Sequence, residues 1–291
     1  MTKTTNLRLI VAGALFALAA GAQAQQAPTF TVNPNSNGLS SSGQQFDANV
    51  LNGVSSALVT QIGDNRYQSV GYIQYNGFSL NSGTVGVEKT MLNFGGLGYG
   101  LYAEFTQTFT CSGLLSPGVT CGIDTIALSL YGNGGAGNVY GGATLDSAPT
   151  IAKTGSQILL GTVDTIILGE AGLGIGGNAF QTVNTNFKIT DAGSNFFIKP
   201  DPFFNFAFSS FSNTTQGISC RNGMATGTTP TDSTDPEENP CVNANTVAIN
   251  SEIGNTDFNG LPAEVPEPGS LALMGLGLLG LTAYRRKRAQ K

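Results

Sequence analysis

Histidine and tryptophan are absent from this chain of 291 residues, and charged residues make up only 11% of it. Without imidazole there is no Ser-His-Asp or Cys-His nucleophile system, no histidine zinc motif and no histidine pH switch. Soluble domains average about 25% charged residues and about 7% glycine, whereas this chain contains 40 glycines. This composition argues against a cytoplasmic enzyme and favours an exported, β-rich protein.

The N-terminus has the three parts of a secretory signal peptide. Lys3 and Arg8 form a positive start, residues 9–20 are apolar, and Ala22 and Ala24 precede an abrupt polar stretch. Signal peptidase needs such small side chains beside the bond that it cuts. We therefore expect the first 24 residues to be a signal peptide that is removed on export. A buried N-terminal helix would leave the small residues and the polar switch unexplained.

The C-terminus has the parts of a short membrane segment. Pro266, Glu267 and Pro268 precede an uncharged apolar run, Leu271–Tyr284. As a helix this run would span about 21 Å of a hydrocarbon core of about 30 Å. A basic cluster then ends the run, and its members are Arg285, Arg286, Lys287 and Arg288. By the positive-inside rule such a cluster stays on the cytoplasmic side of the membrane. Because it directly follows an apolar run, we interpret it as the end of a membrane segment and not as a nucleic-acid-binding patch.

In this order of parts, residues 265–291 resemble the sorting signal of the PEP-CTERM proteins of Gram-negative bacteria. In that family a membrane-embedded exosortase is thought to cut near the motif and release the protein to the exterior, often alongside exopolysaccharide production. The resemblance implies that Pro266, Glu267 and Pro268 form the recognition motif. It also implies a transient inner-membrane segment at Leu271–Ala283 that the basic cluster stops. These residues would be acted on by another enzyme and would catalyse nothing themselves.

The region between the two signals is strongly acidic. Residues 25–264 contain six cationic residues and seventeen acidic ones, a net charge of −11. Such a surface repels nucleic acid and anionic lipid. It favours divalent cations or neutral sugar polymers as partners.

Alternating apolar and polar residues predict β-strands through this region. In one segment Leu101, Ala103, Phe105 and Phe109 alternate with polar neighbours, and Ile126, Leu128 and Leu130 do so in another. A third alternation runs through Phe204, Phe206 and Phe208. Further strands are expected near the ranges 67–80, 84–94, 139–145, 157–168, 180–190 and 247–253. No internal window has a convincing helical period, so we expect residues 25–264 to form one antiparallel β-sandwich or jelly roll.

Four cysteines fit an oxidising compartment. Cys111 and Cys121 flank a Ser-Pro-Gly turn, and Cys220 and Cys241 flank a stretch rich in Thr, Asp and Pro. Four cysteines allow three disulfide connectivities. We favour the sequential one, because each pair would close a short loop worth roughly 3 kcal/mol.

Two motifs have weak functional interpretations. Gly172–Gly177 formally matches GxGxxG, but residues 178–190 after it lack helix formers, so a dinucleotide site is not expected. The acidic stretch 232–238 offers four carboxylates. It could contribute oxygens to a Ca²⁺ shell, although a solvated loop is the favoured interpretation. We expect no metal site and no cofactor.

Carboxylate pairs for glycoside hydrolysis could lie far apart in the sequence. The acidic residues in or beside expected strands are Glu88, Glu104, Asp124, Asp164 and Glu170. Tyrosines could stack weakly on sugar rings, and the candidates are Tyr72, Tyr75, Tyr99, Tyr102, Tyr131 and Tyr140. Outward strand positions for the acids and ordinary packing for the tyrosines are the simpler interpretations.

Three segments, 98–105, 128–131 and 30–34, resemble the flocculation-associated PEP-CTERM proteins, which are implicated in holding cells and exopolysaccharide together. This resemblance implies a non-catalytic matrix or adhesion protein, exported to the cell surface or exterior, with an exosortase and extracellular polysaccharide as partners. The alternative is a secreted enzyme or lectin-like protein that modifies or binds polysaccharide on the same β-scaffold.

Overall fold

The computed structural model describes residues 27–81, 84–93, 98–135, 137–212, 217–222, 232–233 and 241–259. The expected signal peptide and the expected sorting tail lie outside these residues. Among the described residues, no helix has the length and apolarity needed to cross a membrane.

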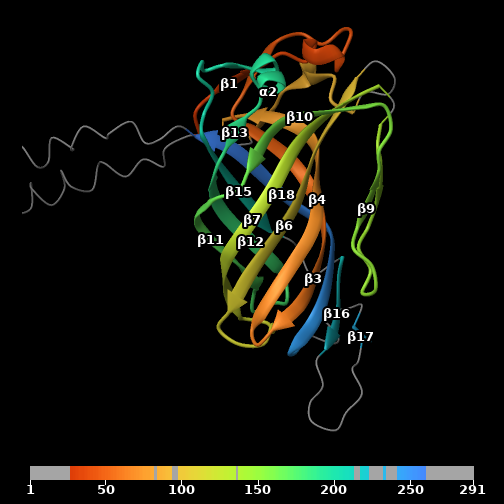
Figure 1. Cartoon of the computed structure of the whole chain (residues 1–291), viewed down its shortest axis with the longest axis vertical. Coiled ribbons are helices and arrows are strands. Elements are labelled where there is room, and N and C mark those ends of the chain that lie inside the picture. The colour runs from red at the N-terminus through yellow and green to blue at the C-terminus, as the bar shows by residue number, and fades with distance from the viewer. Residues whose placement is uncertain are drawn as a thin grey trace, which may run out of the picture. The chain divides into compact units, whose positions relative to one another are not determined.

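Eight long strands form one antiparallel sheet in which each strand lies beside the next one in the sequence. They are β3 (Val50–Gly63), β4 (Arg66–Leu80), β6 (Tyr99–Cys111), β7 (Thr120–Gly134), β11 (Ile166–Leu173), β12 (Ala179–Asn186), β15 (Phe206–Ser212) and β18 (Ala244–Asn259). Figure 1 shows these strands running side by side along the long axis of the sheet.

The sheet closes on itself. β18 pairs with β3 along eleven residue pairs, and β11 pairs with β7 through Ala171 and Cys121. β10 (Ser156–Val163) pairs with the other half of β7, and β13 (Lys188–Ile189) pairs with β10. Every one of the eight strands therefore has a partner along both edges, which leaves few unpaired backbone groups.

The prediction of an all-β, antiparallel domain is confirmed. The layers of the expected sandwich are the facing halves of this one sheet, which pack across a common core. Among the described residues, neighbouring strands of the sheet follow one another in sequence order, which is not the strand order of a jelly roll. Strand β3 was not expected, and the strand expected at 84–94 is reduced to β5 (Val85–Gly86) and the short helix η2 (Glu88–Thr90).

A small second sheet covers one end of the closed sheet (Figure 1). It consists of β1 (Phe30–Val32), β2 (Phe46–Ala48) and β14 (Phe197–Lys199), and it is accompanied by η1 (Ser36–Gly38) and α2 (Asp191–Phe196). The Thr190 hydroxyl accepts a hydrogen bond from the backbone N–H of Gly193 and so caps α2. Phe30 packs edge-on against Phe197 and Phe258, which joins this end to the interior.

Disulfides stabilise the opposite end of the sheet. The structure pairs Cys111 with Cys121 and Cys220 with Cys241, the connectivity expected from the sequence. The second pair lies beside β16 (Ile218–Asn222), which pairs with β18 and with β17 (Asp232–Ser233). Buried Tyr67 donates to the carbonyl oxygen of Ala244 and accepts from the N–H of Leu115, so its hydroxyl ties three segments together.

The alternation expected in β6 is confirmed, since Leu101, Ala103 and Phe109 are buried in the core. The alternation in β15 is reversed. Ala207 is buried in the interior, where it lies opposite Thr185 and Phe258, so half-buried Phe206 points outward. Because side chains alternate with a period of two, neighbouring strands decide which set faces inward. Ala207 borders an interior cavity of about 30 Å³ that is also lined by Phe187 and Phe258.

An arm of chain leaves β7 and returns to β10 across the outer face of the sheet (Figure 1). Its hairpin is formed by β8 (Val139–Gly141) and β9 (Thr150–Ala152), which pair only with each other. We call residues 137–155 the arm.

Candidate functional site

Four of the six tyrosines named from the sequence gather where the arm lies against the outer face of the sheet. Tyr102 of β6 stacks on Tyr131 of β7, with ring centroids 5.2 Å apart. Tyr140 of the arm lies 5.1 Å from Tyr72 of β4 and 6.3 Å from Tyr102. Cross-strand pairing explains this gathering, since Tyr102 lies directly opposite Tyr131 in the register of β6 and β7.

The other two tyrosines belong to the interior. Tyr75 is buried and shares a hydrogen bond with Thr256 of β18, and burial raises its pKa to about 12. Tyr99 packs edge-on against Phe196 of α2, and burial raises its pKa further. Ordinary packing, the simpler interpretation from the sequence, therefore holds for Tyr75 and Tyr99, because neither ring faces the outer surface.

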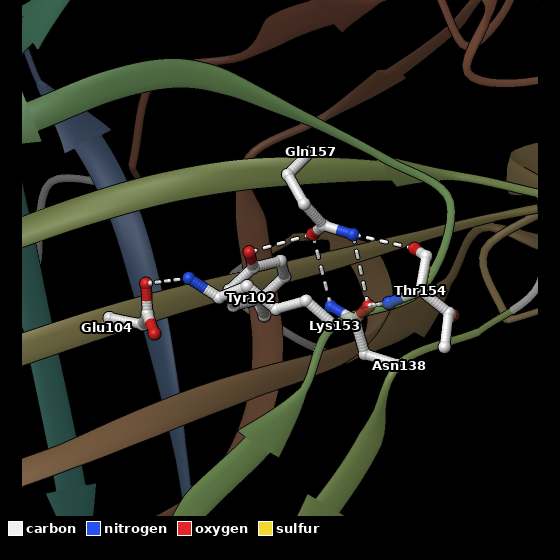
Figure 2. Close-up of polar contacts among 6 residues, drawn as sticks. All are labelled: Tyr102, Glu104, Asn138, Lys153, Thr154 and Gln157. Carbon is white, nitrogen blue, oxygen red and sulfur yellow. Dashed lines mark hydrogen bonds and ion pairs between the residues drawn. The ribbon is translucent and has the colours of Figure 1, made fainter.

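A network of amide hydrogen bonds fixes the base of the arm, as Figure 2 shows. The side chains of Asn138 and Gln157 bond to each other in both directions at 3.2 and 3.3 Å. Gln157 also donates to the carbonyl of Thr154, whose N–H donates to Asn138. Buried Tyr102 donates to Gln157 at 2.8 Å. The arm and the tyrosine cluster are thus held by one satisfied polar network.

One ion pair lies beside the tyrosines (Figure 2). The Lys153 ammonium is 2.8 Å from the Glu104 carboxylate, and it lies over the rings of Tyr102 and Tyr131 at 5.9 and 5.3 Å. Burial, followed by the charge of Glu104, raises the pKa of Tyr102 above its usual range. Burial likewise raises the pKa of Tyr140 to about 12. Tyr102 and Tyr140 are therefore neutral at physiological pH, and neither can act as a general base.

A groove of about 370 Å³ lies between the arm and the outer face of β4, β6 and β7. We call it the arm groove. It is lined by Val70, Gly71, Tyr72, Glu104, Phe105, Thr106, Ala127, Ser129, Pro149 and Ile151. Small-molecule sites in proteins usually have about 300–1,000 Å³, so this groove is large enough for a ligand.

The arm is attached over the groove by contacts to β3 and β18. The Asn250 side chain accepts a hydrogen bond from the N–H of Ala143 at 2.8 Å and donates to the carbonyl of the same residue at 2.9 Å. Ser56 donates to the same Asn250 oxygen. A Cβ on Gly142 would lie 2.6 Å from that oxygen, so a larger residue there would displace the Asn250 amide.

Three of the five acidic residues named as possible hydrolytic groups have separate partners. Glu104 pairs with Lys153, and Asp124 accepts a hydrogen bond from Thr110. Asp164 accepts from Lys188, Thr165 and Asn186, which lowers its pKa to about 2. Glu88 lies in η2 and Glu170 in β11. The five acids come from different elements, although Glu170 lies opposite Gly122 of β7 and therefore on the same exposed face as Asp124.

A different acid, Glu252, was missed from the sequence. It lies on β18, points into the closed sheet and is only 7% exposed. Burial raises its pKa to about 7, although a hydrogen bond from Ser55 partly opposes the shift. Gln107 is also buried here, and its side-chain oxygen has no partner among the described residues.

A β-bulge explains why Glu252 points inward. The pairing of β18 with β3 shifts between Asn250 and Glu252, and Ser251 has a φ of 60°. Before the bulge Val247 and Ile249 face the interior, whereas after it Glu252 does. A bulge adds one residue to a strand and re-aims the side chains that follow. The local sequence does not indicate a bulge at Ser251, because serine is not a residue type that usually adopts positive φ.

The cavities around Glu252 are small. Two interior cavities of about 50 and 30 Å³ border its side chain, which is room for ordered water and not for a sugar ring. No second acidic residue lines either cavity. Across the described ranges, no group of three or more Cys, Asp or Glu residues is arranged to hold a metal ion.

Several residues named from the sequence lie outside the described residues. These are Ala22 and Ala24 of the signal peptide, Pro266, Glu267 and Pro268 of the sorting motif, and the cluster Arg285, Arg286, Lys287 and Arg288. Most of the acidic stretch 232–238 also lies outside them. The glycine-rich motif is described, and it forms the hairpin between β11 and β12.

Comparison with known protein families gives a match near the C-terminus. Residues 264–288 match the PEP-CTERM protein-sorting motif. The motif is that of exported proteins of Gram-negative bacteria that an exosortase processes, so this chain is exported to the cell surface or the exterior. No curated protein and no solved structure matches the chain.

Proposed function

We propose that this chain is a non-catalytic matrix or adhesion protein that associates with extracellular polysaccharide and helps cells to form biofilm or floc. The observation that carries the proposal is the sorting motif at residues 264–288, because it delivers the protein to the place where such polymers accumulate. The exosortase acts on the tail while the C-terminal helix holds the chain transiently in the inner membrane. The flocculation-associated type of PEP-CTERM protein is the subtype that we propose.

The described domain suits a structural role outside the cell. Its sheet is closed, two disulfides lie at one end, and its strands have few free edges for uncontrolled pairing. Glu104, Asp124 and Asp164 have separate partners, which favours a non-catalytic function over hydrolysis by these three acids.

A polysaccharide-modifying enzyme is the alternative, and Glu252 is the observation that favours it. A carboxyl with a pKa near 7 is typical of functional sites as well as of structural networks. The neighbouring cavities nevertheless lack a second carboxylate, which both retaining and inverting glycosidases usually need. The matrix role is therefore the better supported one.

Deletion of the gene in its host tests the proposal, with cell aggregation and retained polysaccharide as the two measurements. We expect both to fall and to return when the full chain is supplied. The variants Asp164→Asn, Asp124→Asn and Glu252→Gln should restore aggregation as well as the unchanged chain does. A deletion strain that aggregates normally would contradict the matrix role. A folded, exported single-carboxylate variant that fails completely would support the enzyme.

A further inference from the structure

The arm groove combines apolar and hydroxyl-bearing surfaces in the way that a sugar ring requires. Val70 and Ala127 come from the sheet, and Pro149 and Ile151 from the arm. Thr106 and Ser129 add hydroxyl groups, and Glu104 adds a carboxylate. Apolar walls with a few placed polar groups are the usual composition of a ligand site. The C–H faces of a pyranose ring can pack on the apolar side chains, and its hydroxyl groups can bond to the polar ones.

The charges around the groove favour a neutral ligand. The Glu104 carboxylate in the groove is compensated by Lys153 at 2.8 Å, so the pair carries no net charge. Residues 25–264 as a whole have a net charge of −11. An anionic polymer would be repelled by this surface, whereas a neutral one would not.

The groove is already formed without a ligand. Asn250 and Ser56 hold Ala143 of the arm, and Tyr140 packs on Tyr72. The network of Asn138 and Gln157 fixes the other end of the arm. A site whose walls are fixed in advance loses less conformational entropy on binding.

We propose that the arm groove binds a neutral saccharide unit of an extracellular polymer, with Thr106, Ser129 and Glu104 bonding to its hydroxyl groups. This inference rests on the proposed function and names the surface through which the protein holds the polymer. Because the groove lies between a sheet and a hairpin, a chain of sugars can continue beyond the bound unit.

Binding of polysaccharides to the exported protein recovered from culture tests the site. The probes are the neutral polymers dextran and galactomannan, the exopolysaccharide of the host, and the polyanion alginate, all compared by affinity electrophoresis. We expect retardation by at least one neutral polymer or by the host exopolysaccharide, and none by alginate. The double variant Thr106→Leu and Ser129→Leu removes two hydroxyl groups and fills the groove, so its affinity should fall at least tenfold.

The matched control is the double variant Thr182→Leu and Asn184→Leu on the outward positions of β12, away from the arm. It makes the same kind of change on another part of the outer face, and it should bind as the unchanged protein does. Equal thermal melting of both variants shows that folding is not the cause.

Three results would overturn the groove proposal: equal binding by the groove variant, equal loss in the control, or preference for alginate. If the unchanged protein binds a neutral polymer but the groove variant binds equally well, the polymer association stands and only the site is wrong. If gene deletion leaves aggregation unchanged, the proposed function itself fails, whatever the electrophoresis shows.

Discussion

Glu252 makes the folded protein sensitive to pH at the scale of a single residue. In the unfolded chain its pKa is the ordinary value of 4.5, whereas burial raises the pKa to about 7 in the folded protein. Between these two pH values the folded state keeps a proton that the unfolded state has released. The free energy of unfolding therefore falls as pH rises through this window, by up to about 1.4 kcal/mol per pH unit.

Glu252→Gln should remove this dependence. Gln keeps the size of the side chain and an oxygen that can accept the hydrogen bond from Ser55. We expect the variant to gain about 3 kcal/mol relative to the unchanged protein between pH 4.5 and pH 8, as measured by urea unfolding. Asp257, whose pKa is raised to about 6, contributes in the same direction in both proteins, so the difference between them isolates Glu252. Parallel pH profiles would refute the prediction.

At the scale of the elements, the attachment of the arm to the sheet depends on hydrogen bonds made by one side chain, Asn250. Asn250 bonds to both the N–H and the carbonyl of Ala143. It is the last residue of β18 before the bulge at Ser251, and it faces outward because Val247 and Ile249 face the interior. The bulge re-aims the residues that follow it, so it directs Glu252 into the interior and leaves the contact of Asn250 with the arm unchanged.

Asn250→Ala should loosen the arm without opening the sheet. The two bonds to Ala143 are lost, which costs about 1–3 kcal/mol locally. We expect amide hydrogen exchange in residues 139–152 to accelerate at least tenfold, while the amides shared by β3 and β4 change little. Asn184→Ala on β12 is the control. In this variant the amides of the arm should exchange at the same rate as in the unchanged protein. Unchanged exchange in the arm of Asn250→Ala would show that other contacts hold it.

At the scale of the whole molecule, function depends on delivery. We expect the mature extracellular protein to lack the signal peptide, residues 1–24, and the tail beyond the Pro266 motif. Replacing Arg285, Arg286, Lys287 and Arg288 by Gln weakens the positive-inside signal, so the protein should remain in the membrane or periplasm. Intact mass and cell fractionation measure both effects. Protein that is free in the medium and still carries residues 285–291 would contradict the processing scheme.

The tyrosine cluster was only partly predictable. Alternation in the sequence identified Tyr102 and Tyr131 as outward residues, because strand periodicity is local. The same period of two puts Tyr72 and Tyr75 on opposite faces of β4, but only the position of the arm shows that Tyr140 packs on Tyr72. Glu252 was missed because a bulge leaves no signature in composition.

The sequence alone determined where the protein is sent, which cysteines are close enough in the chain to pair, and that strands dominate. These properties depend on short contiguous segments: a motif read by another protein, a short loop, and a period of two. Only the tertiary structure decided that the sheet closes, that Ala207 rather than Phe206 faces inward, and that the arm covers a groove. These features depend on pairing between residues far apart in the chain, and their energies come from packing and hydrogen bonds that exist only once those residues meet.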